Sequence, residues 1–100
     1  MSSRRKSRKR ALDALYASEI RNSDATELLQ DTAAGVADRQ NQAAIFDYAE
    51  AIVIGVTRNL AQIDNDLRQI SDGWSLERMP NIDRSILRLG AWEILFNEDV

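Results

Sequence analysis

The sequence predicts an all-α fold of about five helices. Apolar residues recur at three- and four-residue spacings through most of the 100 residues, which is typical of amphipathic helices. The composition agrees, because the chain has one proline and four glycines and is rich in good helix formers. It contains no cysteine and no histidine, which excludes a disulfide framework and removes the commonest general base and metal ligand.

The most apolar segment, residues 79–96, predicts a central core helix around which the others pack. Asn81 is placed to cap its start, and beyond that cap the segment is apolar on nearly every side. Arg88 and Glu93 are the only charges in its second half, so they must be paired or lie at a rim. Gly90 costs about 1 kcal/mol relative to alanine in a helix, which predicts the close approach of a neighbouring helix.

Breaks in the apolar pattern divide the rest of the chain. We expect a first helix up to Ile20 and a second from a cap at Ser23 or Asp24 to Gly35, followed by a polar loop over 37–42. Two consecutive helices follow at 43–57 and 59–71, and Ser71–Gly73 ends the second of them. A connector of about one turn over 74–79 leads to the core helix. Asp64 and Asp66 resemble a carboxylate pair, but residues two apart on a helix face different directions. We therefore interpret them as part of a solvated helix face.

Six of the 13 basic residues gather near the N-terminus: Arg4, Arg5, Lys6, Arg8, Lys9 and Arg10. Residues 11–100 hold 7 basic against 16 acidic residues, a net charge of −9. The basic cluster forms either the first two turns of the first helix or a disordered arm, since clustered cations at a helix N-terminus favour fraying. This distribution indicates a local anion-binding site, with a solubilising tail as the alternative.

Tyr16 makes the basic cluster a candidate RNA site. If the cluster is helical, Arg5, Lys9 and Tyr16 lie along one flank. Cations that hold phosphates beside a ring that stacks a base are typical of single-stranded RNA sites. A core position with the hydroxyl at the rim is the alternative for Tyr16.

A second candidate surface lies around Glu77 and Asp83. These carboxylates flank Trp74 and Met79, which we expect to be exposed at the edge of the core helix. Exposed aromatic and methionine side chains are enriched at interfaces, so we predict a protein partner there. Helix capping and solvation of the two carboxylates are the alternative explanation.

Catalytic and membrane functions find no support in the sequence. It has no Gly-rich phosphate loop, no cluster of metal ligands and no nucleophile–base pair, so we expect no enzyme, catalytic residue, metal or cofactor. No apolar run reaches the roughly 18 residues of a membrane span. The basic start is not followed by the apolar stretch of a secretory signal, so we expect a cytoplasmic protein.

Two motifs resemble the NusB family of transcription antitermination factors. They are Arg-Lys-Arg-Ala-Leu-Asp-Ala-Leu-Tyr at 8–16 and Ile-Asp-Arg-Ser-Ile-Leu-Arg-Leu, followed by Trp-Glu-Ile-Leu, within 82–95. The resemblance implies a NusB-like helical bundle, with a basic RNA-binding arm at 1–10 and a helical domain at 11–100. It also implies binding of single-stranded boxA RNA together with the ribosomal protein NusE, in the RNA polymerase antitermination complex.

The resemblance also implies roles for individual residues and leaves an alternative function open. It implies that the basic cluster and Tyr16 contact RNA and that Glu77 and Asp83 face NusE. The Leu-Arg-Leu-Gly-Ala-Trp-Glu pattern at 87–93 is also similar to the NusB-like domain of ribosomal-RNA cytosine methyltransferases, so a domain detached from such an enzyme is the alternative.

Family members continue beyond the equivalent of Val100 with two further helices. In their absence we expect an exposed apolar patch at Ile94, Leu95 and Phe96. Such a patch favours a homodimer or a loosely packed helical state.

Overall fold

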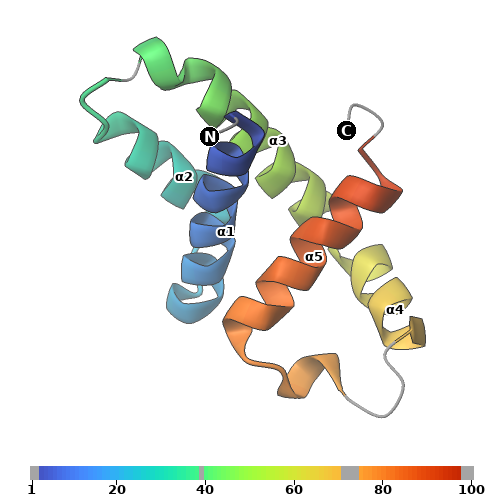
Figure 1. The fold of residues 1–100 in the computed structure, drawn as a ribbon. Helices are drawn as coiled ribbons and strands as arrows, with labels where there is room; N and C mark the ends of the chain where they lie inside the picture. Colours follow the sequence, from blue (N-terminus) through green and yellow to red (C-terminus); the bar gives the residue numbers. More distant parts are fainter. Residues whose placement is uncertain (1–2, 39, 71–74, 98–100) are drawn as a thin grey trace.

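The computed structural model describes residues 3–38, 40–70 and 75–97. Within these ranges the chain forms five α-helices and two short 3-10 helices and no strand, which confirms the all-α prediction (Figure 1). None of these helices is both long and apolar enough to cross a membrane. The elements in order are α1 (Ser3–Arg21), α2 (Ala25–Ala34), η1 (Gln40–Gln42), α3 (Ala43–Arg58), α4 (Leu60–Ile70), η2 (Leu76–Arg78) and α5 (Asn81–Leu95).

The predicted helix ends are mostly confirmed. Asp24 caps α2, its side chain accepting a hydrogen bond from the Thr26 amide at 3.2 Å, and Gly35 follows the last turn. α3 and α4 separate at Asn59, whose side-chain amide donates to the Gly55 carbonyl at 2.8 Å. The connector contains the single turn η2, whereas the predicted stop at 71–73 lies outside the described residues.

Two local predictions are wrong. The polar segment predicted as a loop ends in the 3-10 helix η1, because a polar sequence does not prevent a short turn of helix. Asn81 does not cap α5: Pro80 occupies the N-cap position, and Asn81 is the first helical residue. The Asn81 side chain instead accepts a hydrogen bond from Arg84, one turn further along the helix.

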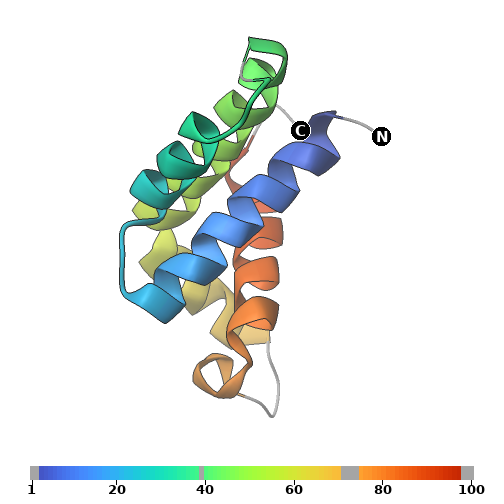
Figure 2. The same ribbon diagram turned by 90° about the vertical axis from the view of Figure 1, so that its left-hand side faces the viewer.

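The core is organised around α3 and not around α5. α3 packs against α1, α2, α4 and α5, and Figure 2 shows α1 lying across α3 and α5. The core side chains of α3 are almost fully buried: Ala49, Ile52, Val53 and Val56 are each 2% exposed or less. An apolar stripe at helical spacing identifies a buried face, so α3 carried the stronger signal for the centre of the fold.

α5 buries only one face. Ser85, Leu89 and Trp92 are buried, whereas Ile94 and Leu95 are 83% and 55% exposed. The predicted exposure of the apolar patch is therefore confirmed for Ile94 and Leu95. Phe96 differs, because it is partly buried and packs against the core.

Ion pairs satisfy the two charges in the second half of α5, Arg88 and Glu93, as predicted. Arg88 donates from Nε and Nη2 to the two carboxylate oxygens of Asp64 at 2.9 Å each, and from Nη1 to Glu19. Arg84 also pairs with Glu19, at 3.0 Å. Asp64 is therefore not on a solvated face: it is 8% exposed, because Arg88 approaches it from α5. Asp66 does accept a hydrogen bond from the exposed Gln62.

Glu19 should make the fold sensitive to acid. Burial alone would raise the pKa of Glu19, but hydrogen bonds from Arg84 and Arg88 outweigh burial and lower that pKa below its ordinary value of 4.5. The stabilisation is therefore fully present above about pH 4.5 and is lost as the pH falls through the lowered pKa. Glu19→Gln should cost about 1–2 kcal/mol of unfolding free energy at neutral pH and flatten the decline in acid.

Urea unfolding of both chains at a series of acidic pH values measures this difference. Glu50→Gln, a change in an exposed glutamate on α3, is the matched control and should behave as the parent chain. An equally steep acid decline in Glu19→Gln and in the parent chain would contradict the prediction.

Candidate nucleic-acid interface

The basic cluster forms the first two turns of α1. The alternatives were a helix and a disordered arm, and the structure shows the helix, since α1 runs without a break from Ser3 to Arg21. Ser7 anchors this start: its hydroxyl is 1% exposed and lies 2.8 Å from the Ile45 carbonyl oxygen of α3, within donating distance. The buried stripe continues through Ala11 and Ala14. These contacts oppose the fraying expected from the clustered charge.

Arg8 and Arg4 turn toward α3 and α5. The Nε of Arg8 lies 2.8 and 2.9 Å from the two carboxylate oxygens of Glu93 and donates to them, and this hydrogen bonding raises the pKa of Arg8. Glu93 also accepts the Tyr48 hydroxyl at 2.6 Å. The Arg4 guanidinium lies 3.6 Å from the centre of the Tyr48 ring, a cation–π contact. Both arginines are therefore already held by the protein.

The other cations of the cluster remain near the surface. Arg10 lies over the Phe46 ring at 5.2 Å, and Lys9 pairs with Asp13 at 3.1 Å on the exposed surface of α1. Arg5 and Lys6 are exposed.

Tyr16 shares the outer flank of α1 with Arg5 and Lys9, since positions 5, 9 and 16 of one helix lie on one side. It is 37% exposed, so part of the side chain is open to solvent. The structure thus brings Arg5, Lys9 and Tyr16 together on one exposed flank. Arg4 and Arg8, which the sequence also predicts at the RNA site, contact Tyr48 of α3 and Glu93 of α5.

A hollow of about 1100 Å³ adjoins this flank. Its lining combines the cations of α1 with apolar side chains from three helices: Leu12, Ile45, Ile86 and Leu89. Phosphates favour the cationic wall and bases the apolar one, so the hollow suits a single strand with unstacked bases.

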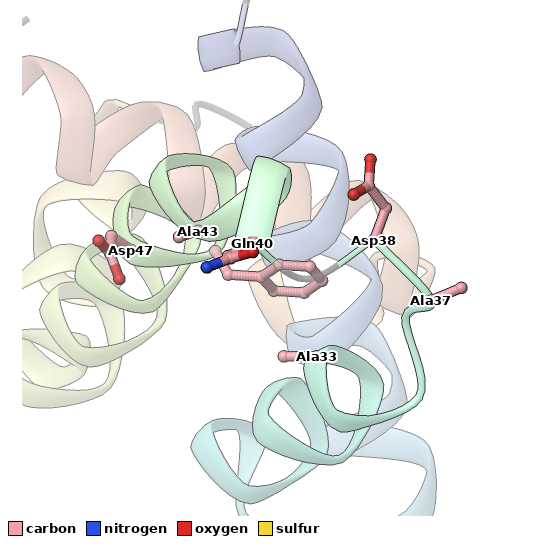
Figure 3. A pocket seen from close by; sticks show the side chains of 7 residues that line it. Ala33, Ala37, Asp38, Gln40, Ala43 and Asp47 are labelled. Atoms are coloured by element: carbon pink, nitrogen blue, oxygen red, sulfur yellow. The ribbon is translucent and has the colours of Figure 1, made fainter.

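A second hollow, of about 640 Å³, lies between the end of α2 and the start of α3 (Figure 3). Asp38 and Asp47 lie at its opposite ends, and small side chains line much of the rest. The described lining of this hollow has these two carboxylates and no cation, so it does not suit a phosphate backbone, whereas Asp13 and Asp38 in the larger hollow lie among cations of α1.

The predicted partner surface lies at η2 and the start of α5. Hydrogen bonds from Ser75 and Arg68 lower the pKa of the exposed Glu77 to about 2, and Asp83 is exposed in the first turn of α5. Met79 is not exposed as predicted: it is 8% exposed, because η2 turns it into the core with Leu76. Trp74 lies outside the described residues.

Sequence reasoning missed Ser7 and Tyr48. Ser7 carried a readable signal, since it is the one small residue inside the basic cluster and continues the spacing of Ala11 and Ala14. Glu93 was expected to be paired, but its partners lie 85 and 45 residues away, so no local spacing indicates them.

Comparisons with known proteins agree with this architecture. The model of the NusB family matches residues 5–100. The transcription antitermination protein NusB of Nocardioides sp. is 45% identical over 100 residues, covering 100% of this chain and 70% of that protein. The protein of the same name from Clavibacter michiganensis subsp. michiganensis is 47% identical over 103 residues, covering 100% and 73%.

A solved structure gives the same result. T. maritima NusB superimposes with a TM-score of 0.82 at 29% identity, covering 100% of this chain and 68% of that one. The match extends over α1 to α5 and so includes the basic flank and the helices that hold it. The chain therefore belongs to the NusB family.

Proposed function

We propose that this chain binds single-stranded boxA-type RNA along the outer flank of α1 and acts in transcription antitermination. The observation that carries the proposal is the joint presentation of Arg5, Lys9 and Tyr16 on an exposed helix flank beside a partly apolar hollow. The relatives named as transcription antitermination proteins match the whole chain, which favours this role over a domain detached from a methyltransferase. Such a protein acts on nascent RNA, in the cytoplasm, by binding and not by catalysis.

We further propose that the ribosomal protein NusE binds beside Glu77 and Asp83, within the RNA polymerase antitermination complex. Both carboxylates are exposed, and Glu77 is held in place by Ser75 and Arg68. Charged groups at the rim of an interface set the orientation and association rate of a partner of complementary charge.

The RNA site is tested by removing the two cations that share its flank with Tyr16. Arg5→Gln with Lys9→Gln should reduce the steepness of the log–log dependence of RNA affinity on salt by about 1.4, from roughly 0.7 per phosphate contact. Arg21→Gln with Arg58→Gln is the matched control, since it removes two exposed cations elsewhere and should leave the slope unchanged. Fluorescence anisotropy with a boxA-type oligonucleotide at several salt concentrations measures both.

The same assay tests the stacking part of the site. Tyr16→Ala should weaken binding by about 1–3 kcal/mol if a base stacks on the ring, whereas Tyr16→Phe keeps the ring and most of the affinity. Equal salt slopes for the Arg5–Lys9 variant and the parent chain, or equal affinities for Tyr16→Ala and the parent, would move the RNA site away from this flank.

The NusE site is tested by charge reversal. Glu77→Lys with Asp83→Lys should weaken NusE binding at least tenfold, because it reverses both charges of the proposed interface. The helical content should stay the same, since both side chains are exposed. Asp31→Lys with Glu50→Lys, on α2 and α3, is the control. Titration calorimetry that gave equal NusE affinities for the two double variants would place the interface elsewhere.

A further inference from the structure

The start of α1 faces an electrostatic problem. Six cations lie within its first two turns, at the end of the helix where the dipole is also positive. Its first acidic residue is Asp13, too far along the helix to compensate the first turn. Like charges one turn apart destabilise a helix, so other elements must hold this start in helical form.

Glu93 provides the missing negative charge from the far end of the sequence. Its side chain is 10% exposed and receives Arg8 on both carboxylate oxygens and the Tyr48 hydroxyl on one of them. The side-chain amide of Asn97 donates to the same hydroxyl at 2.8 Å. The carboxylate therefore joins α1, α3 and α5 at one point.

Tyr48 extends this junction by one helical turn. Its ring carries the Arg4 guanidinium at 3.6 Å, and Arg4 precedes Arg8 by four residues on the same side of α1. Burial is the main cause that raises the pKa of Tyr48, with Glu93 adding to it, so its hydroxyl remains a donor at neutral pH. Glu93 and Tyr48 thus hold two arginines in succession.

This arrangement determines which cations face outward. With Arg4 held over Tyr48 and Arg8 held at Glu93, the rotation of α1 about its own axis is set, and Arg5 and Lys9 lie on its outer flank. A flank that is already helical before RNA binds avoids the entropic cost of ordering it during binding.

We infer that Glu93 and Tyr48 are positioning residues for RNA binding, which hold the first two turns of α1 in place without touching RNA. The inference rests on the proposed RNA-binding function. It also predicts an effect of unexpected sign, because removing a negative charge near an RNA site ordinarily strengthens binding.

The test compares two carboxylate-to-amide changes along the same pair of helices. Glu93→Gln should weaken binding of a boxA-type oligonucleotide by about fivefold, near the net value of one ordinary hydrogen bond. Glu19→Gln breaks an ion pair between the other end of α1 and α5, and it should change affinity less than twofold. RNA affinity of Glu93→Gln equal to or above that of the parent chain would overturn the inference.

A charge-swapped chain separates positioning from direct RNA contact. Arg8→Glu with Glu93→Arg restores an ion pair at the same place, so it should recover most of the affinity lost by Arg8→Glu alone. If Arg8 contacted a phosphate itself, the swap would give no recovery. Tyr48→Phe keeps the ring for Arg4 but loses the hydrogen bond to Glu93, and it should weaken binding less than Glu93→Gln.

Hydrogen exchange gives a readout that a general loss of stability would not produce. In Glu93→Gln the amides of residues 7–11 should exchange faster in the free chain, while the amides of α4 remain as protected as in the parent. RNA should restore the protection of residues 7–11. Uniformly faster exchange across all helices would overturn the inference. If the parent chain bound no RNA, the proposed function itself would fail, which is a different result from a binding parent with an unaffected Glu93→Gln.

Discussion

Asp64→Ala is expected to lower the free energy of unfolding by about 3 kcal/mol, since removal of one partner from a buried ion pair leaves the other charge uncompensated. The Arg88 and Asp64 side chains are 15% and 12% exposed, so water replaces little of the lost interaction. Arg88 retains Glu19, which keeps the expected loss at the lower end of the range for buried pairs. Urea unfolding at neutral pH measures the change.

Two further variants define the cause of this loss. Asp66→Ala removes the neighbouring carboxylate, which accepts an exposed hydrogen bond from Gln62, and should cost less than about 0.5 kcal/mol. Asp64→Leu combined with Arg88→Met replaces both charges by apolar groups and should recover much of the loss. A cost below about 1 kcal/mol for Asp64→Ala would show that solvent reaches the pair and compensates it.

The helices could be predicted from the sequence because their signals are local. The apolar spacing of residues 45–70 and the cap at Asp24 each depend on residues a few positions apart. The prediction that α5 is the centre of the fold was wrong because it depended on contacts between distant parts of the chain. An apolar segment indicates which residues avoid water, but which sides its neighbours cover depends on contacts distant in sequence.

The same distinction between local patterns and contacts distant in sequence applies to the candidate site. The flank of Arg5, Lys9 and Tyr16 lies within one helix, so helical periodicity was enough to assemble it. The ion pair of Arg8 with Glu93 joins residues 85 positions apart, so helical spacing places Arg8 on the side of Leu12 and Leu15 but does not identify its partner. Composition therefore identified the charge of the site, and only the tertiary structure identified the partners of Arg4 and Arg8 on α3 and α5.

Gly55 and Gly90, the two glycines inside helices, show that helix packing too depends on contacts distant in sequence. A glycine within a helix indicates close approach or mere tolerance, and its sequence position does not distinguish the two. The close approach predicted at Gly90 is wrong, since a Cβ there would meet no heavy atom within 4 Å. It occurs instead at Gly55, where a Cβ would lie 2.0 Å from Nε1 of the buried Trp92.

Gly55→Ala should therefore destabilise the fold by about 2 kcal/mol, because overpacking against a buried ring outweighs the better helix propensity of alanine. Gly90→Ala is the matched control and should stabilise the fold by about 0.5–1 kcal/mol. Adding Trp92→Phe to Gly55→Ala removes the indole atoms that meet the new methyl group, so the double variant should lose less than the two single losses combined. Thermal and urea unfolding of the parent chain, Gly55→Ala, Trp92→Phe and the double variant measure this coupling. Gly55→Ala that was as stable as Gly90→Ala would show that the indole ring can move aside at no cost.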